Sequence, residues 1–63
     1  MVEIERYESG KIKLERHLDE NNKLHSLYGP ALISYYEDGD IEDKCYFIHG
    51  VEKSTKEFFS HIV

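Results

Sequence analysis

The sequence predicts a small, β-dominated α+β domain: an antiparallel sheet of about four strands, made of two hairpins, with one short C-terminal helix. Three observations predict it. Apolar and polar residues alternate with period two in several segments, as they do in half-buried strands. Turns containing Gly10 and Gly39 separate these segments. The last residues change to a helical period. A chain of 63 residues is expected to form a single domain, 1–63.

Residues 1–20 are predicted to form the first hairpin. Val2 and Ile4 alternate with acidic residues, which predicts a strand with one apolar face. Gly10 can adopt the positive φ that a tight turn requires. The alternation resumes with Ile12 and Leu14, so we expect a second strand paired with the first.

Residues 21–30 are predicted to form a junction loop, and residues 31–50 the second hairpin. The polar residues 19–22 favour side-chain turns, which end the preceding strand. Pro30 cannot donate a hydrogen bond, so we expect it at the start or edge of a strand. Residues 31–36 have high β propensity. Residues 41–48 are the longest candidate strand, which His49 and Gly50 end.

Residues 54–62 are predicted to form the C-terminal helix. Ser54 and Glu57 have the spacing of a capping box, in which each side chain accepts a hydrogen bond from the other residue's backbone N–H. We expect the helix to close one face of the sheet with its two phenylalanines. The apolar residues at helical spacing are Thr55, Phe58, Phe59 and Ile62, if the threonine methyl group is counted.

The two hairpins form an internal repeat. Residues 7–12 align with residues 36–41 at an offset of 29, and four of the six positions are identical. The repeated unit is an aromatic residue, a glycine turn and an apolar residue on the leaving strand. Extending the alignment places Asn21 on Gly50, so we expect both leaving strands to end at a residue that tolerates a left-handed backbone.

These motifs resemble the short β-hairpin repeats, akin to MORN repeats, of bacterial and bacteriophage proteins, some of which are classed with toxin–antitoxin antitoxins. The sequence departs from that pattern at residues 26–28, where a charged pair is usual, and at residues 21–22, where the pattern prefers Asn-Gly. The resemblance implies a hairpin-repeat fold, a phage or prophage origin and a bacterial cytoplasmic location, but no chemistry of its own. The matching residues are Asn22, Lys23, Leu24, His25, Gly29, Pro30, Ala31, Tyr36, Gly39, Gly50, Glu57 and Phe58.

The composition restricts the classes of partner. The net charge of −5, with eight basic against thirteen acidic residues, argues against direct binding of nucleic acid, which needs many phosphate contacts. A single cysteine excludes an internal disulfide and favours a reducing cytoplasm. No apolar run approaches the roughly 18 residues that span a membrane, so we expect a soluble protein without a membrane partner.

No catalytic, metal-binding or cofactor-binding residue is predicted, and the protein is not expected to be an enzyme. Cys45 lies in a predicted core strand, where a small buried apolar side chain is expected rather than a nucleophile. The glycines do not have the spacing of a phosphate-binding loop. The histidines lack the close spacing of a zinc site; they are His17, His25, His49 and His61.

Tyrosines and one apolar pair are the candidate interface. Tyrosine combines apolar area with a polar tip, which suits protein interfaces. Adjacent strand residues point to opposite faces, so either a partner or the helix must cover one ring of the pair 35–36. Interface contact and intramolecular packing both remain open. The candidate interface residues are Leu27, Tyr28, Tyr35, Tyr36 and Tyr46.

An acidic cluster occupies the predicted second turn, where five of seven residues are acidic. Two interpretations remain open. The cluster is a solvated hairpin tip, or it imitates a phosphate backbone and occupies a protein that handles nucleic acid. The cluster comprises Glu37, Asp38, Asp40, Glu42 and Asp43.

The predicted function is a small, non-enzymatic protein–protein interaction module, encoded by a phage or prophage. So few repeats cannot bury their faces alone. We therefore expect a second copy of the chain, or another protein, to complete the sheet, with a homodimer as the expected form. The alternative is an acidic inhibitor, similar to an antitoxin, that blocks a basic host protein which handles nucleic acid.

Overall fold

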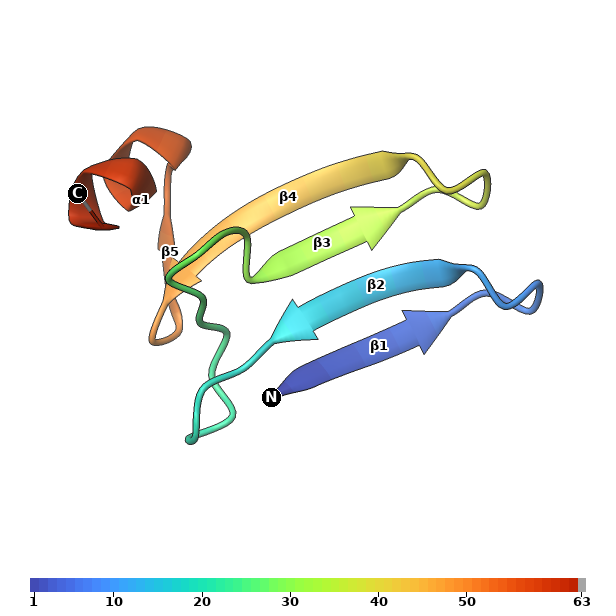
Figure 1. Ribbon diagram of the computed structural model, residues 1–63, viewed down its shortest axis with the longest axis horizontal. Coiled ribbons are helices and arrows are strands. Elements are labelled where there is room, and N and C mark those ends of the chain that lie inside the picture. Colours follow the sequence, from blue (N-terminus) through green and yellow to red (C-terminus); the bar gives the residue numbers. More distant parts are fainter. Residues whose placement is uncertain (63) are drawn as a thin grey trace.

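The computed structural model describes residues 1–62, with side-chain environments for residues 1–60. One antiparallel sheet has the strand order β1-β2-β3-β4-β5, and a helix follows it (Figure 1). The predicted β-dominated fold is therefore confirmed, but the expected number of about four strands is too low by one. The elements are β1 (Val2–Arg6), β2 (Ile12–His17), β3 (Leu32–Tyr35), β4 (Ile41–Ile48), β5 (Val51–Lys53) and α1 (Thr55–Ile62).

The additional strand β5 follows a two-residue turn. Ile48 pairs with Val51, and the residues between them, His49 and Gly50, have φ angles of 47° and 85°. Positive φ at both central residues gives the turn the twist that antiparallel strands need. Because β5 has only three residues, its alternation is too short to detect, and the sequence predicts only a break there.

The sequence repeat is also a structural repeat, as the hydrogen bonds of the two turns show. In the first hairpin, the Tyr7 N–H donates to the Lys11 carbonyl at 2.8 Å, and the Gly10 N–H donates to the Tyr7 carbonyl at 2.9 Å. Both glycines of the repeat have a positive φ, 93° and 100°. The equivalent bonds, 29 residues later, join Tyr36 to Asp40 at 2.9 Å and Gly39 to Tyr36 at 3.0 Å.

The strand register of the two hairpins shifts at equivalent places. The shift lies between Glu5 and Arg6 in the first hairpin and between Ser34 and Tyr35 in the second. Each shift adds one residue to the leaving strand, as a β-bulge does, and increases the local twist. The two hairpins therefore share their turn and their bulge as well as their sequence.

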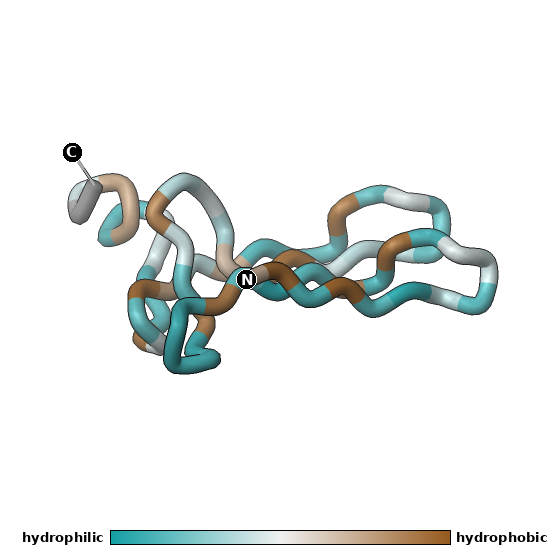
Figure 2. The backbone as a smooth tube through the Cα atoms, turned by 60° about the horizontal axis from the view of Figure 1, so that its bottom comes forward, coloured by the Kyte–Doolittle hydropathy of each residue, from teal (hydrophilic) through white to brown (hydrophobic). Residues whose placement is uncertain are grey.

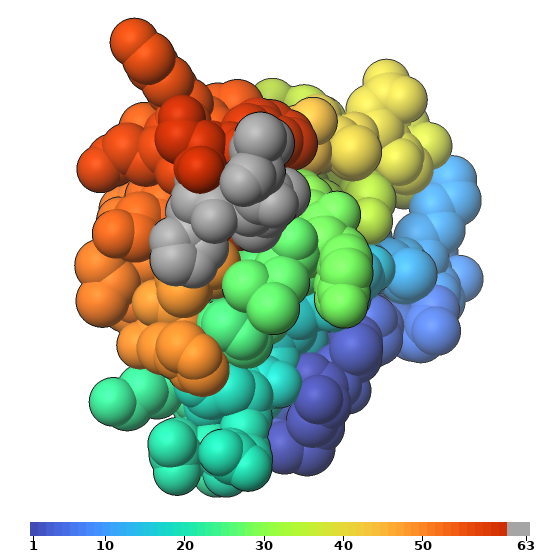
Figure 3. Space-filling view, turned by 60° about the vertical axis from the view of Figure 1, so that its left-hand side comes forward, coloured from blue at the N-terminus to red at the C-terminus, as the bar shows by residue number. Residues whose placement is uncertain are grey.

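The junction ties the two hairpins together at the end of the sheet opposite the glycine turns. The His25 N–H donates to the His17 carbonyl at the end of β2, and the Ser26 N–H donates to the Phe47 carbonyl in β4. The Gly50 N–H donates to the Leu24 carbonyl at 2.7 Å. The junction, coloured green in Figure 3, accordingly lies against the orange β4–β5 turn. The junction is therefore an ordered crossing segment, held by backbone hydrogen bonds.

The repeat alignment is wrong by one position at the end of the first unit. Asn22, rather than Asn21, has the left-handed backbone, with a φ of 61°. The Asp19 side chain explains the displacement, because its Oδ1 atom accepts hydrogen bonds from the backbone N–H groups of Asn21 and Lys23. These bonds form a side-chain turn that the second unit lacks.

The predicted capping box at the start of α1 is confirmed. The Ser54 N–H donates to Glu57 Oε1 at 3.1 Å, and the Glu57 N–H donates to Ser54 Oγ at 3.2 Å. These bonds satisfy two backbone groups at the helix start. The bond from the Ser54 N–H to the carboxylate, followed by contact with the Ser54 side chain, lowers the pKa of Glu57 below its ordinary value.

The helix packs at a corner of the sheet and does not extend across a face. It contacts β4 and β5 among the described elements, and Figure 1 shows it beside β5. Phe58 is fully buried, with its ring centroid 4.7 Å from that of Tyr46, whereas Phe59 is 49% exposed. Phe59 therefore covers the sheet only in part, with its ring centroid 5.8 Å from that of Tyr46. The side chain of Ile62, also predicted on this stripe, lies outside the described side chains.

The sheet is a single layer. The molecule measures 37 × 24 × 14 Å, and the tube in Figure 2 shows the two hairpins as a thin, twisted sheet. Among the described residues, the buried hydrophobic side chains are Ala31, Ile48 and Phe58. Most of the apolar surface of the sheet therefore has no second layer over it.

Candidate protein interaction surfaces

An apolar stripe crosses the face of the sheet opposite to the helix. The register pairs Leu32 with Cys45, and the alternation puts Leu14 and Phe47 on the same face. All four side chains are half-buried by their neighbours in the sheet. Tyr46 points to the other face, where it contacts Phe58. We call Leu14, Leu32, Cys45 and Phe47 the apolar stripe.

Charged groups border the apolar stripe on the β1 side. Arg16 Nη2 lies 2.6 Å from Glu5 Oε1, and Arg16 Nη1 lies 3.9 Å from Glu3 Oε1. The register places all three side chains on the same face as the stripe. An apolar centre beside a polar rim is the usual arrangement of a protein interface.

Cys45 lies within this stripe, and its surroundings oppose reactivity. Burial raises the pKa of the thiol, and the carboxylates of Asp43 and Glu52 raise it further. A raised pKa reduces the thiolate form, which is the nucleophile. The side chain is half-buried rather than enclosed in a core.

The apolar pair in the junction is exposed. Tyr28 has 97% of its surface exposed, and Leu27 has 40%. The Tyr28 N–H donates to Ser26 Oγ at 3.4 Å. Thus the pair that departs from the MORN-like pattern is presented to solvent.

The three strand tyrosines have different environments. The ring of Tyr46 packs against Phe58 and Phe59, at centroid distances of 4.7 and 5.8 Å. Tyr35 is half-buried on the sheet, and burial followed by the charge of Glu15 raises its pKa. Tyr36 lies just beyond β3 and is 51% exposed. Of these rings, that of Tyr46 serves internal packing.

The acidic cluster surrounds the turn of the second hairpin and is exposed throughout. Two of its members support the backbone: Asp38 Oδ1 accepts from the Asp40 N–H at 2.9 Å, and Asp43 Oδ1 accepts from the Lys44 N–H at 2.9 Å. Glu37 and Glu42 lie near the other hairpin turn, where their charges, after burial, raise the pKa of Tyr7. The cluster therefore combines local backbone support with a negative surface.

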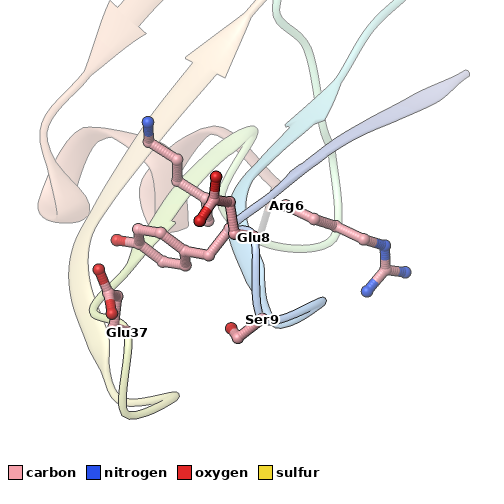
Figure 4. Close-up of a pocket in the computed structure, with 6 residues that line it drawn as sticks. Arg6, Glu8, Ser9 and Glu37 are labelled. Carbon is pink, nitrogen blue, oxygen red and sulfur yellow. The ribbon is translucent and has the colours of Figure 1, made fainter.

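A shallow groove of about 590 Å³ lies between the two hairpin turns. Two positive and two negative side chains line it together with Tyr7 and Ser9, and Figure 4 shows Arg6 extending away from Glu8 and Glu37. None of the residues that line it is buried. The balanced and solvated charges of this groove do not select a ligand. Its lining residues are Arg6, Tyr7, Glu8, Ser9, Lys13 and Glu37.

A histidine pair that the sequence does not reveal joins the junction to the β4–β5 turn. The rings of His25 and His49 stack with centroids 3.9 Å apart, and the His49 N–H donates to His25 Nδ1 at 2.9 Å. His49 Nδ1 lies 2.9 Å from Oδ2 of Asp19, whose side chain is 5% exposed. The hydrogen bond with His49, followed by those from the backbone, lowers the pKa of Asp19 to about 2. These contacts hold the junction against the β4–β5 turn.

Within the part of the chain that the structure describes, no group of three histidine, cysteine or acidic side chains is arranged to bind a metal ion. No helix in the same part is long and apolar enough to cross a membrane.

No protein-family model matches the chain, and no curated protein or solved structure shows significant similarity to it. The resemblance to MORN-like repeats therefore remains a prediction from the motifs.

Proposed function

We propose that the protein is a small, non-enzymatic protein–protein interaction module in which a second copy of the chain covers the apolar stripe. The observation that supports this proposal is the single-layer sheet, with only three buried hydrophobic side chains among the described residues. A chain of this size has little core to stabilise it. Covering the stripe in a homodimer would supply the missing second layer.

The size of the flat side of the molecule is compatible with such a dimer. The flat side of the molecule measures 37 by 24 Å, which is a rectangle of about 890 Å², compared with the roughly 800 Å² that each partner buries in a standard interface. The MORN-like motifs add to the proposal a phage or prophage origin and a bacterial cytoplasmic setting.

Sedimentation of the purified chain at micromolar concentrations tests the homodimer. Two variants at neighbouring positions of β3 form a matched pair, because their side chains point to opposite faces. Leu32→Glu places a charge in the stripe, opposite Arg16, whereas Ile33→Lys places one on the other face, opposite Glu15. Each new charge thus has a local partner of opposite sign that favours folding. We expect Leu32→Glu to dissociate the dimer and Ile33→Lys to retain it.

A wild-type chain that sediments as a monomer up to about 100 μM would contradict the homodimer, as would equal dissociation by the two variants. A dissociation constant of about 100 μM corresponds to an association free energy of about 5.5 kcal/mol, which is weaker than that of a specific interface.

The second candidate function is an acidic inhibitor of a basic protein that handles nucleic acid. The exposed acidic cluster on the second hairpin turn favours it. A test must avoid Asp38 and Asp43, because both support the backbone. Replacing Asp40 with Asn and Glu42 with Gln keeps those bonds and removes two charges. The inhibitor proposal requires this double variant to lose a salt-sensitive interaction with a basic host protein, and retention of that interaction would contradict it.

A further inference from the structure

We propose that the free edge of β1 binds an extended segment of a partner protein in which basic and apolar residues alternate. This inference concerns the partner's chemistry and rests on the backbone edge of β1, although the side chains of Glu3 and Glu5 also border the apolar stripe. Strand addition of this kind gains affinity from main-chain hydrogen bonds and selectivity from alternate side chains.

Within residues 1–62, which the structure describes, the outer side of β1 has no neighbouring strand. β1 is the first strand of the sheet, with β2 on one side (Figure 1). Met1 and Leu18 exchange two backbone hydrogen bonds, at 2.8 and 3.0 Å. Since such pairs alternate along an antiparallel ladder, the next residue, Val2, and then Ile4 direct their N–H and C=O groups outward.

The opposing strand supports this alternation. His17, the partner of Val2 in the register, directs both of its backbone groups away from β1: its N–H donates to Ala31 and its carbonyl accepts from His25. The outward groups of Val2 and Ile4 are therefore available to a further strand.

The side chains of β1 are divided by face, and all of its residues are exposed. Val2 and Ile4, which are 53% and 40% exposed, lie on one face. The carboxylates of Glu3 and Glu5 lie on the other, with side chains 54% and 49% exposed. A single guanidinium, that of Arg16, contacts both carboxylates, so two carboxylates share one cation on this face, while the Met1 ammonium precedes β1 and Arg6 ends it.

This charge pattern selects the occupant. A second copy of β1, paired so that its apolar side chains meet Val2 and Ile4, would place glutamate opposite glutamate, and like charges directly opposite one another destabilise a sheet. A strand with lysine or arginine opposite Glu3 and Glu5, and β-branched residues opposite Val2 and Ile4, gains favourable pairs on both faces. The net charge of −5 also attracts a basic segment.

The test uses two blocked hexapeptides in which valine alternates with lysine or with glutamate. They are titrated into the isotopically labelled protein, and amide shifts and hydrogen exchange are recorded by NMR. We expect the lysine peptide to bind, with the largest shifts in β1 and slower exchange of the Val2 and Ile4 amides. We expect the glutamate peptide to leave these signals unchanged.

Two pairs of variants separate backbone from charge. Ile4→Pro removes the outward N–H without removing a bond to β2, which a proline on an edge strand permits, and Ile4→Ala keeps that N–H. We expect Ile4→Pro to lose binding of the lysine peptide and Ile4→Ala to retain it. Replacing Glu3 and Glu5 with Gln should weaken binding about three- to tenfold, as expected for two cross-strand charge pairs.

Several results would overturn the proposal: equal binding of both peptides, shifts centred away from β1, or equal binding by the two Ile4 variants. Absence of shifts with the lysine peptide at millimolar concentration would do the same. The homodimer is judged separately, by sedimentation without peptide, so failure of one proposal leaves the other intact.

Discussion

Removing the Phe58 ring should cost the protein a large part of its stability. Phe58 is the largest fully buried side chain among the described residues, and its ring contacts those of Tyr46 and Phe59. Phe→Ala at a fully buried position costs about 3 to 5 kcal/mol. A domain of this length has a total stability of about 3 to 9 kcal/mol. We therefore expect Phe58→Ala to lower the free energy of unfolding by at least a third.

Phe59→Ala is the matched control, because it removes the same ring from the next residue of the helix. Its side chain is 49% exposed, so it gains about half of the 1.5 to 3 kcal/mol that full burial of such a side chain provides. We expect Phe59→Ala to cost about 1 kcal/mol.

Urea unfolding, followed by circular dichroism at equal chain concentration, measures both variants. Because α1 contacts only β4 and β5 among the described elements, the variant Phe58→Ala should lose its helical signal and the near-ultraviolet signal of Tyr46 at the lowest urea concentrations. Hydrogen exchange in β1 and β2 should change later. Equal costs for the two variants, or a cost below 1 kcal/mol for Phe58→Ala, would refute the assignment of the core to this corner.

Three further predictions concern the turns and the helix start. Gly10→Ala and Gly39→Ala should each lower the free energy of unfolding in urea by about 1 to 2 kcal/mol. The two costs should be equal, because both glycines have a positive φ and open space around the missing Cβ. Unequal costs would argue against equivalent turns. Asp19→Asn should destabilise the protein at pH 7. The folded pKa of Asp19, about 2, lies below its ordinary 3.8, so the carboxylate stabilises the fold above about pH 4. The difference in the free energy of unfolding between the variant and the wild type should therefore shrink as the pH falls to 2. A difference that is independent of pH would contradict this. Ser54→Ala should cost about 1 kcal/mol and reduce helicity, and unchanged circular dichroism would show that the capping box is dispensable.

The local features of the fold could be predicted because they depend on neighbouring residues. Alternation and the turn glycines were sufficient for both hairpins, and β4 has the predicted bounds, Ile41–Ile48. The capping box was also predictable, because Ser54 and Glu57 are three residues apart and their hydrogen bonds are local. In these segments, propensity, pattern and turn chemistry favour the same structure.

The features that were missed depend on contacts between distant residues or on very short elements. Asp19 and His49 are 30 residues apart, and the junction, which is not periodic, brings them together. The position of α1 depends on β5, because this strand sets where the helix begins. The apolar stripe of the helix alone cannot show which part of the sheet the helix contacts. One signal for β5 was present: a two-residue turn ending in Gly50 between two apolar residues.

The two ends of the sheet differ in a way that affects how such a protein could change in length. At one end, β5 and α1 occupy the side of β4 that a further hairpin would need. At the other end, β1 leaves the ladder open, and the hairpins already repeat at a fixed offset of 29 residues. Growth or shortening of the array by whole units is therefore directional. A duplicated unit inserted before β1 would meet a compatible edge, whereas the same unit placed after β4 would displace the helix and the ring that forms most of the core.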